Sequence, residues 1–199
     1  MKTLADAWEW YAATRRSLER MQRIGAKYWD EIPWDSAAIG RDDDLRMLEA
    51  RVIREETTRS LTPIDDLAVV VLFSVFESIV RDYLVAKIRP EAARLSIPIL
   101  KEAADDAIRG VEEGSFYRRV LEPLKLQARI PADLVTRVDQ VRDFRNWVAH
   151  GRRDEPTNNV KPRAAYERLQ AFLEALNVAV KTEAVQAEQP GAGGASATP

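Results

Sequence analysis

The residues with the clearest capacity for chemistry lie in one short segment, residues 142–153, which reads RDFRNWVAHGRR. It contains His150, the only histidine of the chain, and a histidine side chain can take or give a proton near neutral pH. Arg145 adds a guanidinium that stays charged, and Asn146 adds an amide that can donate a hydrogen bond. Together, these three groups could transfer a proton and stabilise the negative charge of a substrate.

Helical spacing decides which of these groups can meet. Asn146 and His150 are four residues apart, so they are neighbours on a helix surface. Arg145 lies about 140° from His150 around the helix, but its long stem can carry the guanidinium to the same side. The alternative is structural: the histidine interacts with the carbonyl groups at the helix end, the arginine pairs with an acidic neighbour, and the asparagine is plain surface. The residues alone leave both interpretations open.

The element that must position these groups is predicted to be a helix from about Pro131 to Ala149. Proline is favoured in a first helical turn, and Gly151 is placed to end the helix. Apolar residues recur at helical spacing and predict the buried face, namely Leu134, Val138, Val141, Phe144, Trp147 and Val148.

The remainder of the chain also has helical periodicity, and no segment alternates with period two, so the predicted fold class is all-α. Thr62-Pro63, followed by Asp65 and Asp66, predicts a helix start. The apolar run LAVVVLFSVF comes directly after it and predicts the central helix of a bundle. The predicted helices cover residues 3–30, 42–61, 62–88, 98–111, 116–127, 131–149 and 162–180.

We expect three parts along the chain. Residues 1–61 form an N-terminal helical extension, residues 62–183 form a helical bundle, and residues 184–199 form a disordered tail that is rich in glycine and alanine. The composition, with 46% hydrophobic and 31% charged residues in 199, is that of a globular protein.

Composition also narrows the function classes. The chain has no cysteine, which excludes disulfides, thiolate metal sites and cysteine nucleophiles. Asp42, Asp43 and Asp44 are adjacent on a helix and point in different directions, so we predict an acidic helix start and no metal site. No cofactor is expected. The apolar run is too short to cross a bilayer and no signal segment is visible, which predicts a cytoplasmic protein without membrane contact.

The charge balance requires any nucleic-acid contact to be local. Thirty basic residues against thirty-two acidic ones give a net charge of −2, so bulk charge cannot attract a nucleic acid. Residues 115–153, however, hold nine Arg or Lys against four acidic residues. That local excess can contact an RNA backbone through its phosphates.

In this all-helical setting the chain resembles the HEPN superfamily, whose nuclease members share a helical bundle and an Arg, four to six residues, His motif. Arg145 and His150 have four residues between them, and Asn146 is the polar residue that commonly follows the Arg. The resemblance covers roughly residues 62–180. The run FSVFESIVRDYL, residues 73–84, is most similar to the RiboL-PSP and MAE-type groups.

The resemblance implies a metal-independent RNA endonuclease that uses the ribose 2′-hydroxyl as nucleophile. It also implies a homodimer, with an antitoxin or defence-system partner as a further possibility. Glu77 is expected to orient Arg145 or His150 from a facing helix, or else to form a structural ion pair with Arg81. The implied residues are Arg145, Asn146 and His150 for catalysis, Glu77 and Asp143 in support, and Arg142, Arg152 and Arg153 for RNA contact.

Two other classes remain open. The chain could be a catalytically silent HEPN-like module that binds RNA or a nucleotide. It could also be an interaction subunit that contacts a partner through the tryptophans near its N-terminus, which are Trp8, Trp10, Trp29 and Trp34.

Overall fold

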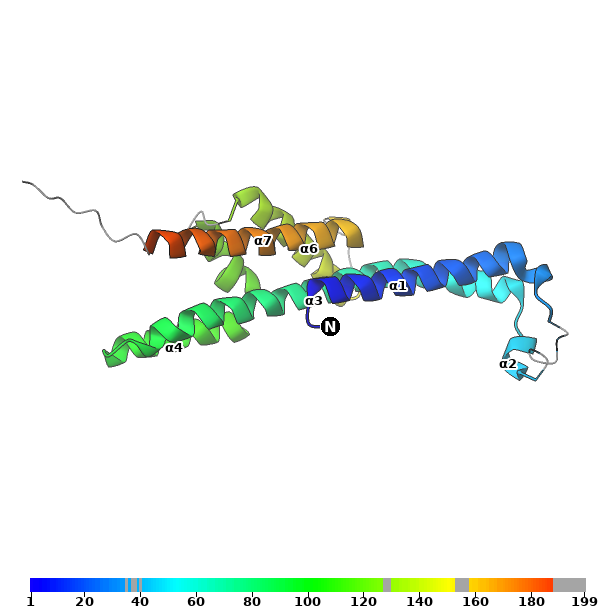
Figure 1. The fold of residues 1–199 in the computed structure, drawn as a ribbon, viewed down its shortest axis with the longest axis horizontal. Helices are drawn as coiled ribbons and strands as arrows, with labels where there is room; N and C mark the ends of the chain where they lie inside the picture. Colours follow the sequence, from blue (N-terminus) through cyan, green and yellow to red (C-terminus); the bar gives the residue numbers. More distant parts are fainter. Residues whose placement is uncertain (35, 37–38, 40, 127–129, 153–157, 188–199) are drawn as a thin grey trace, which may run out of the picture. The chain divides into compact units, whose positions relative to one another are not determined.

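The computed structural model describes residues 1–34, 36, 39, 41–126, 130–152 and 158–187, and these residues form helices and no strand. The predicted all-α class is therefore confirmed. Within this part of the chain, no helix is both long enough and apolar enough to cross a membrane. The α-helices are α1 (Leu4–Arg23), α2 (Asp43–Arg46), α3 (Ala50–Ala93), α4 (Pro98–Glu113), α5 (Glu122–Leu126), α6 (Ala132–Ala149) and α7 (Pro162–Ala187) (Figure 1). Three single turns complete the set: the π-helical η1 (Ile24–Tyr28) and η3 (Tyr117–Leu121), and the 3-10 turn η2 (Trp29–Glu31).

Backbone contacts divide the chain into two compact units. Unit 1 comprises residues 1–79 and 140–166, and unit 2 comprises residues 80–139 and 167–199. Helices α3, α6 and α7 each contribute to both units. All the described residues of the predicted motif belong to unit 1.

In unit 1, α1 begins with reciprocal hydrogen bonds between Thr3 and Asp6. The Thr3 hydroxyl accepts from the Asp6 amide at 3.1 Å, and the Asp6 carboxylate accepts from the amides of Lys2 and Thr3. Those backbone hydrogen bonds hold the pKa of the Asp6 carboxyl below its ordinary value. At its other end the helix leads into η1, where a Cβ on Gly25 would lie 3.1 Å from the Ile53 side chain. Glycine at this position therefore allows η1 and α3 to approach closely.

The helix start predicted at Thr62-Pro63 is wrong, because α3 runs without interruption from Ala50 to Ala93. Local signals favoured a break there, since proline removes one backbone donor and disfavours a helix interior. Packing on both sides outweighs that cost: Ile53 and Thr57 are buried before the proline, and Ala68 and Val69 are buried after it. The expected central position of the apolar run is confirmed, because Leu72, Phe73 and Phe76 are fully buried.

The boundary expected at residue 61 falls inside α3, so the chain has no helix break there. The three-part division stays a prediction. Helix α7 extends to Ala187, beyond the expected end at Val180, and residues 188–199 of the predicted tail lie outside the described residues.

In unit 2, the helices predicted at residues 98–111 and 116–127 are confirmed as α4 and as η3 with α5. Arg81 binds the end of α4: it donates to the carbonyl oxygen of Val111, and to that of Gly114 at 2.9 Å. Its guanidinium carbon also lies 5.4 Å from the centroid of the Phe116 ring. A helix ends with carbonyl groups that lack partners within the helix, and Arg81 supplies donors for them.

Candidate functional site

The C-terminus of α6 positions His150. Gly151 has a φ of +80°, and the chain reverses through hydrogen bonds from the Gly151 amide to the Val148 carbonyl (3.2 Å) and from the Arg152 amide to the Trp147 carbonyl (3.0 Å). This pair of bonds is the Schellman pattern, in which glycine follows the cap residue because a side chain is strained at positive φ. His150 is that cap residue. Its amide still bonds to the Asn146 carbonyl at 2.9 Å, and its side chain is exposed.

Arg145 lies one and a half turns earlier on α6 and is half-buried. Its Nη2 is 3.9 Å from Oε2 of Glu77 on α3, and its Nη1 donates to Oδ1 of Asn146 at 2.9 Å. The guanidinium carbon is 5.8 Å from the centroid of the Phe73 ring. Glu77 therefore lies within ion-pair distance of Arg145, and its orienting role stays a prediction. Arg81, one turn further along α3, donates to the carbonyl groups at the end of α4.

The structure brings the side chains of Arg145, Asn146 and Glu77 together, whereas the hydrogen bond that joins His150 to Asn146 is formed by backbone groups. Among the described residues, the His150 imidazole makes no hydrogen bond or ion pair, and the buried Nε of Arg145 makes no hydrogen bond. The Asn146 amide is oriented by the bond that its oxygen accepts from Arg145. Its two N–H groups are therefore directed away from that guanidinium.

A residue predicted to contact RNA, Arg142, pairs with a predicted supporting residue, Asp143. Arg142 Nη2 donates to Oδ1 of Asp143 at 2.8 Å. The Arg142 side chain is 23% exposed, so less of it is accessible to a ligand than the sequence suggested. Arg153, the third residue predicted to contact RNA, lies outside the described residues.

Arg152 has a partner that sequence reasoning missed. Its Nη2 is 2.5 Å from Oδ2 of Asp66, and its guanidinium carbon is 5.7 Å from the centroid of the Trp147 ring. In the sequence, Asp66 is half of an acidic pair that favours a helix start at residue 62. Because α3 continues through that point, the Asp66 carboxylate does not cap a helix start and instead pairs with Arg152, which follows α6.

Asp65, the neighbouring carboxylate, binds α1. It accepts a hydrogen bond from the Tyr11 hydroxyl at 2.7 Å and forms an ion pair with Arg15. Burial, together with the hydrogen bond to Asp65 and its charge, raises the pKa of Tyr11 to about 12. The hydrogen bond to Asp65 raises the pKa of Arg15 as well. Asp65 and Asp66 therefore attach α1 and the end of α6 to the same turn of α3.

Most of the aromatic residues singled out in the sequence have partners within the chain. Trp8 stacks on Tyr166 with ring centroids 5.1 Å apart, and Trp29 packs against Trp34 at 4.3 Å. Trp10 is 38% exposed. Trp147 lies 5.5 Å from Phe144, centroid to centroid, so at least one of its faces is packed within the chain.

The arrangement has two chemical capacities. A guanidinium supported by a carboxylate and an amide can stabilise negative charge, and an exposed imidazole at the end of the same helix can exchange a proton with solvent or a ligand. No protein-family model, curated protein or solved structure matches this chain.

Proposed function

We propose that the chain is a metal-independent endoribonuclease of the HEPN type, in which Arg145 stabilises a reacting phosphate and His150 transfers a proton. One observation carries the proposal: Arg145 lies between Glu77 and Asn146 at the end of the same helix that presents an exposed His150. The resemblance to HEPN nucleases supplies the reaction class. It also suggests a toxin or defence context, with an antitoxin as the partner.

The proposed reaction is an attack within the RNA strand. The 2′-oxygen of a ribose forms a bond to the adjacent phosphorus while the bond from that phosphorus to the 5′-oxygen of the next nucleotide breaks. The 2′-hydroxyl loses a proton to a base, and the departing 5′-oxygen gains a proton from an acid. The products are a 2′,3′-cyclic phosphate and a 5′-hydroxyl, and His150 performs one of the two proton transfers.

In this proposal, Arg145 and Asn146 stabilise the negative charge that develops on the phosphate oxygens. The guanidinium of an arginine such as Arg145 can donate to two phosphate oxygens at once. Asn146 directs its N–H groups away from Arg145 and can donate one of them to a phosphate oxygen. Glu77 is a positioning residue, because it acts through the guanidinium of Arg145 rather than on the substrate.

One chain offers one histidine for a reaction with two proton transfers. A homodimer that places two copies of α6 side by side would bring a second His150 to the same cleft, so that one imidazole acts as base and the other as acid. We therefore include a homodimer in the proposal.

His150→Ala tests the role of the imidazole. Loss of a general acid or base costs about 10²–10⁴ in rate, whereas an exposed substitution changes stability by about 0.5 kcal/mol. RNA cleavage is measured in EDTA, with folding checked by circular dichroism. Thr136→Ala, an exposed change on the same helix, is the matched control and should cleave at the parental rate. Cleavage by folded His150→Ala at the parental rate would disprove the proposal.

The nucleophile is tested through the substrate. An RNA strand with a single 2′-deoxy nucleotide at the scissile position should bind normally and resist cleavage, because the attacking hydroxyl is missing. Binding is measured by anisotropy and cleavage by gel, on the same strand. Equal cleavage of matched DNA and RNA strands would show that water is the nucleophile instead.

A second candidate is a catalytically silent HEPN-like module for RNA, a nucleotide or a protein partner. Among the described residues, no hydrogen bond orients the His150 imidazole toward Arg145, and this favours the second candidate. This candidate predicts RNA binding that depends on Arg145, with no cleavage product over long incubation.

A further inference from the structure

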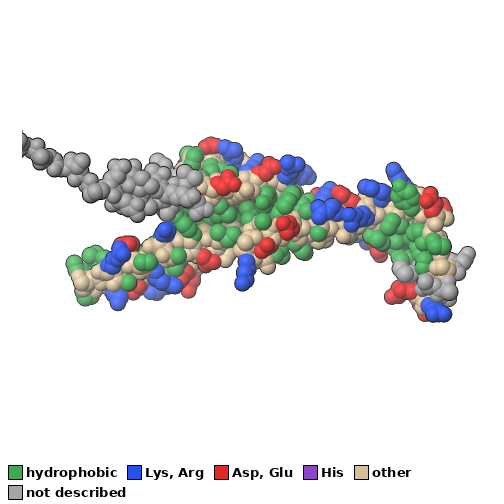
Figure 2. Space-filling model, viewed as in Figure 1, with side chains coloured by type: hydrophobic (Ala, Val, Ile, Leu, Met, Phe, Trp, Pro, Cys, Tyr) green, Lys and Arg blue, Asp and Glu red, His purple; other side chains and the backbone are tan. Residues whose placement is uncertain are grey.

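Two adjoining grooves lie in unit 1, one on the first turns of α3 and the other between those turns and the end of α1 with η1. One has a volume of about 560 Å³ and the other about 490 Å³, and both are lined by Arg54 and Thr58. Gln22 of α1 donates to the Thr58 hydroxyl at 2.9 Å, and this bond joins the two helices at the shared wall. Figure 2 shows Lys and Arg side chains along the stretch where α1 lies beside this part of α3.

The walls of the joined grooves are mainly cationic. Five cations face two carboxylates, a local charge of +3, in a chain whose net charge is −2. The cations are Arg23 and Lys27 on the α1 side and Arg51, Arg54 and Arg59 on α3.

The two carboxylates already have partners. Glu19 accepts from Arg15 at 3.0 Å, and Glu55 accepts from Arg51 at 2.9 Å. In the described part of the chain, by contrast, no ion pair is formed by Arg23, Lys27, Arg54 or Arg59. Four cations of one small surface therefore lack an acidic partner, and anions are the ligands that such a surface attracts.

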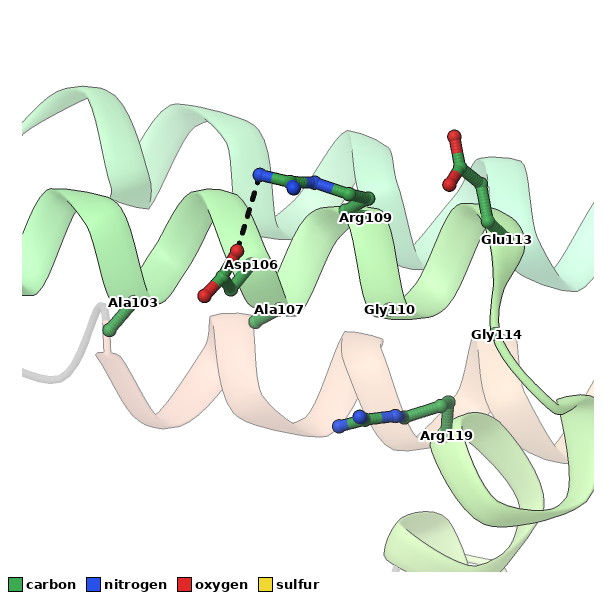
Figure 3. Close-up of a pocket in the computed structure, with 8 residues that line it drawn as sticks. All are labelled: Ala103, Asp106, Ala107, Arg109, Gly110, Glu113, Gly114 and Arg119. Atoms are coloured by element: carbon green, nitrogen blue, oxygen red, sulfur yellow. Dashed lines mark ion pairs between the residues drawn. The ribbon is translucent and has the colours of Figure 1, made fainter.

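A third groove of the described structure does not have this excess of unpaired positive charge. It lies on α4 in unit 2, has a volume of about 650 Å³, and is lined by Ala103, Ala107, Gly110 and Gly114 together with charged residues (Figure 3). Its two cations, Arg109 and Arg119, are matched by Asp106 and Glu113, and Arg109 pairs with Asp106 at 3.2 Å. The joined grooves differ from it by their unmatched positive charge.

We propose that the joined grooves of α1 and α3 bind the phosphate backbone of an RNA strand. Arginine presents a planar fork that matches phosphate oxygens, and a surface with several such forks suits a repeating polyanion better than a single small anion. The choice of RNA as the ligand rests on the proposed function. Arg54 and Glu77 are 23 residues apart on α3, which corresponds to about 35 Å along the helix. The grooves are therefore a docking site separate from Arg145 and His150.

Charge reversal of the shared wall tests this inference. Arg54→Glu/Arg59→Glu removes two phosphate contacts, so the plot of log affinity against log salt should become shallower by about 1.4 for a single strand. Affinity for RNA at moderate salt should fall about tenfold or more. The probe is a labelled 20-nucleotide 2′-O-methyl RNA, which lacks the attacking hydroxyl, followed by fluorescence anisotropy.

Two further variants control the test. Lys101→Glu/Arg109→Glu changes the net charge by the same amount at exposed positions of α4 and should leave binding within about twofold of the parent. Arg23→Glu/Lys27→Glu alters the opposite wall and should reproduce the loss, which covers the case in which the first variant fails to fold.

The outcomes separate the docking site from the nuclease. Loss of binding in both groove variants but not in the α4 control supports the docking site, even if the protein cleaves nothing and the proposed function fails. Parental binding by either folded groove variant, equal losses in the α4 control, or no RNA binding by the parent would overturn it. Displacement of the RNA by polyglutamate of equal charge at equal concentration would identify an acidic protein as the ligand and would also overturn it.

Discussion

Arg152 and Asp66 form an ion pair of 2.5 Å between the chain that leaves α6 and the middle of α3. Arg152 follows His150 by two residues, so this pair holds the end of the motif helix against α3. The Asp66 side chain is 17% exposed and the Arg152 side chain 39% exposed. The pair is therefore less screened by solvent than the surface pairs of the chain.

We predict that Asp66→Asn lowers the free energy of unfolding by about 1 kcal/mol, because the ion pair between the partly buried Asp66 carboxylate and Arg152 is lost. A double-mutant cycle with Arg152→Gln, measured by urea denaturation, should give a coupling energy of about 1 kcal/mol. The same cycle on the exposed pair Glu91–Arg94 should give less than half of that. Equal coupling energies in the two cycles would show that Asp66 has no special structural role.

Gly151→Ala should destabilise the protein by about 1 kcal/mol, because a Cβ at a φ of +80° is strained. Gly110→Ala is the matched control, and it should stabilise the protein. Gly110 is inside α4, its added Cβ would lie 3.5 Å from Arg119, and alanine is favoured over glycine in a helix interior by about 1 kcal/mol. Both changes are measured by thermal unfolding. A shift of the same sign in both variants would contradict the assigned conformation of Gly151.

The raised pKa of Tyr11, about 12 against an ordinary 10.0, predicts a loss of stability at alkaline pH. Below pH 10 the phenol is protonated in both states and its contribution is complete. Between about pH 10 and 12 the unfolded chain releases this proton while the folded chain keeps it. Ionisation therefore stabilises the unfolded state, and the free energy of unfolding falls by up to about 2 kcal/mol.

Tyr11→Phe isolates this contribution, since it removes the phenol and keeps the ring. The difference in unfolding free energy between the parent and Tyr11→Phe should favour the parent at pH 8, where the hydrogen bond to Asp65 is intact. It should shrink steadily from pH 10 to 12 in chemical denaturation. A difference that stays constant over that range would mean that the Tyr11 hydroxyl is not protected by burial and Asp65.

Mixed dimers test the shared cleft of the proposed nuclease. Parental chains are allowed to exchange with an excess of folded His150→Ala chains, so that nearly every parental chain has a partner without the imidazole. If two copies of His150 share the two proton transfers, activity per parental chain should fall well below its value in the unmixed parent. Activity proportional to the number of parental chains, or a monomeric mass at the working concentration, would remove the dimer from the mechanism.

Local sequence patterns were sufficient for most of the helices. Helices α4 and α6 follow from apolar residues at steps of three and four, and the end of α6 follows from Gly151, because these signals act within one or two turns of the backbone. The same locality explains the failure at Thr62-Pro63. The burial of Ile53 and Val69 on either side of the proline comes from distant parts of the fold, and it outweighs a local preference for a break.

The motif divides in the same way. Its spacing places Arg145, Asn146 and His150 on one helix, because residues within five positions are related by helix geometry alone. The approach of Glu77 to Arg145 and of Asp66 to Arg152 joins residues that are 68 and 86 positions apart. Only the packing of α6 against α3 determines which carboxylates meet which guanidinium groups, because charge attraction alone does not select among thirty-two acidic residues.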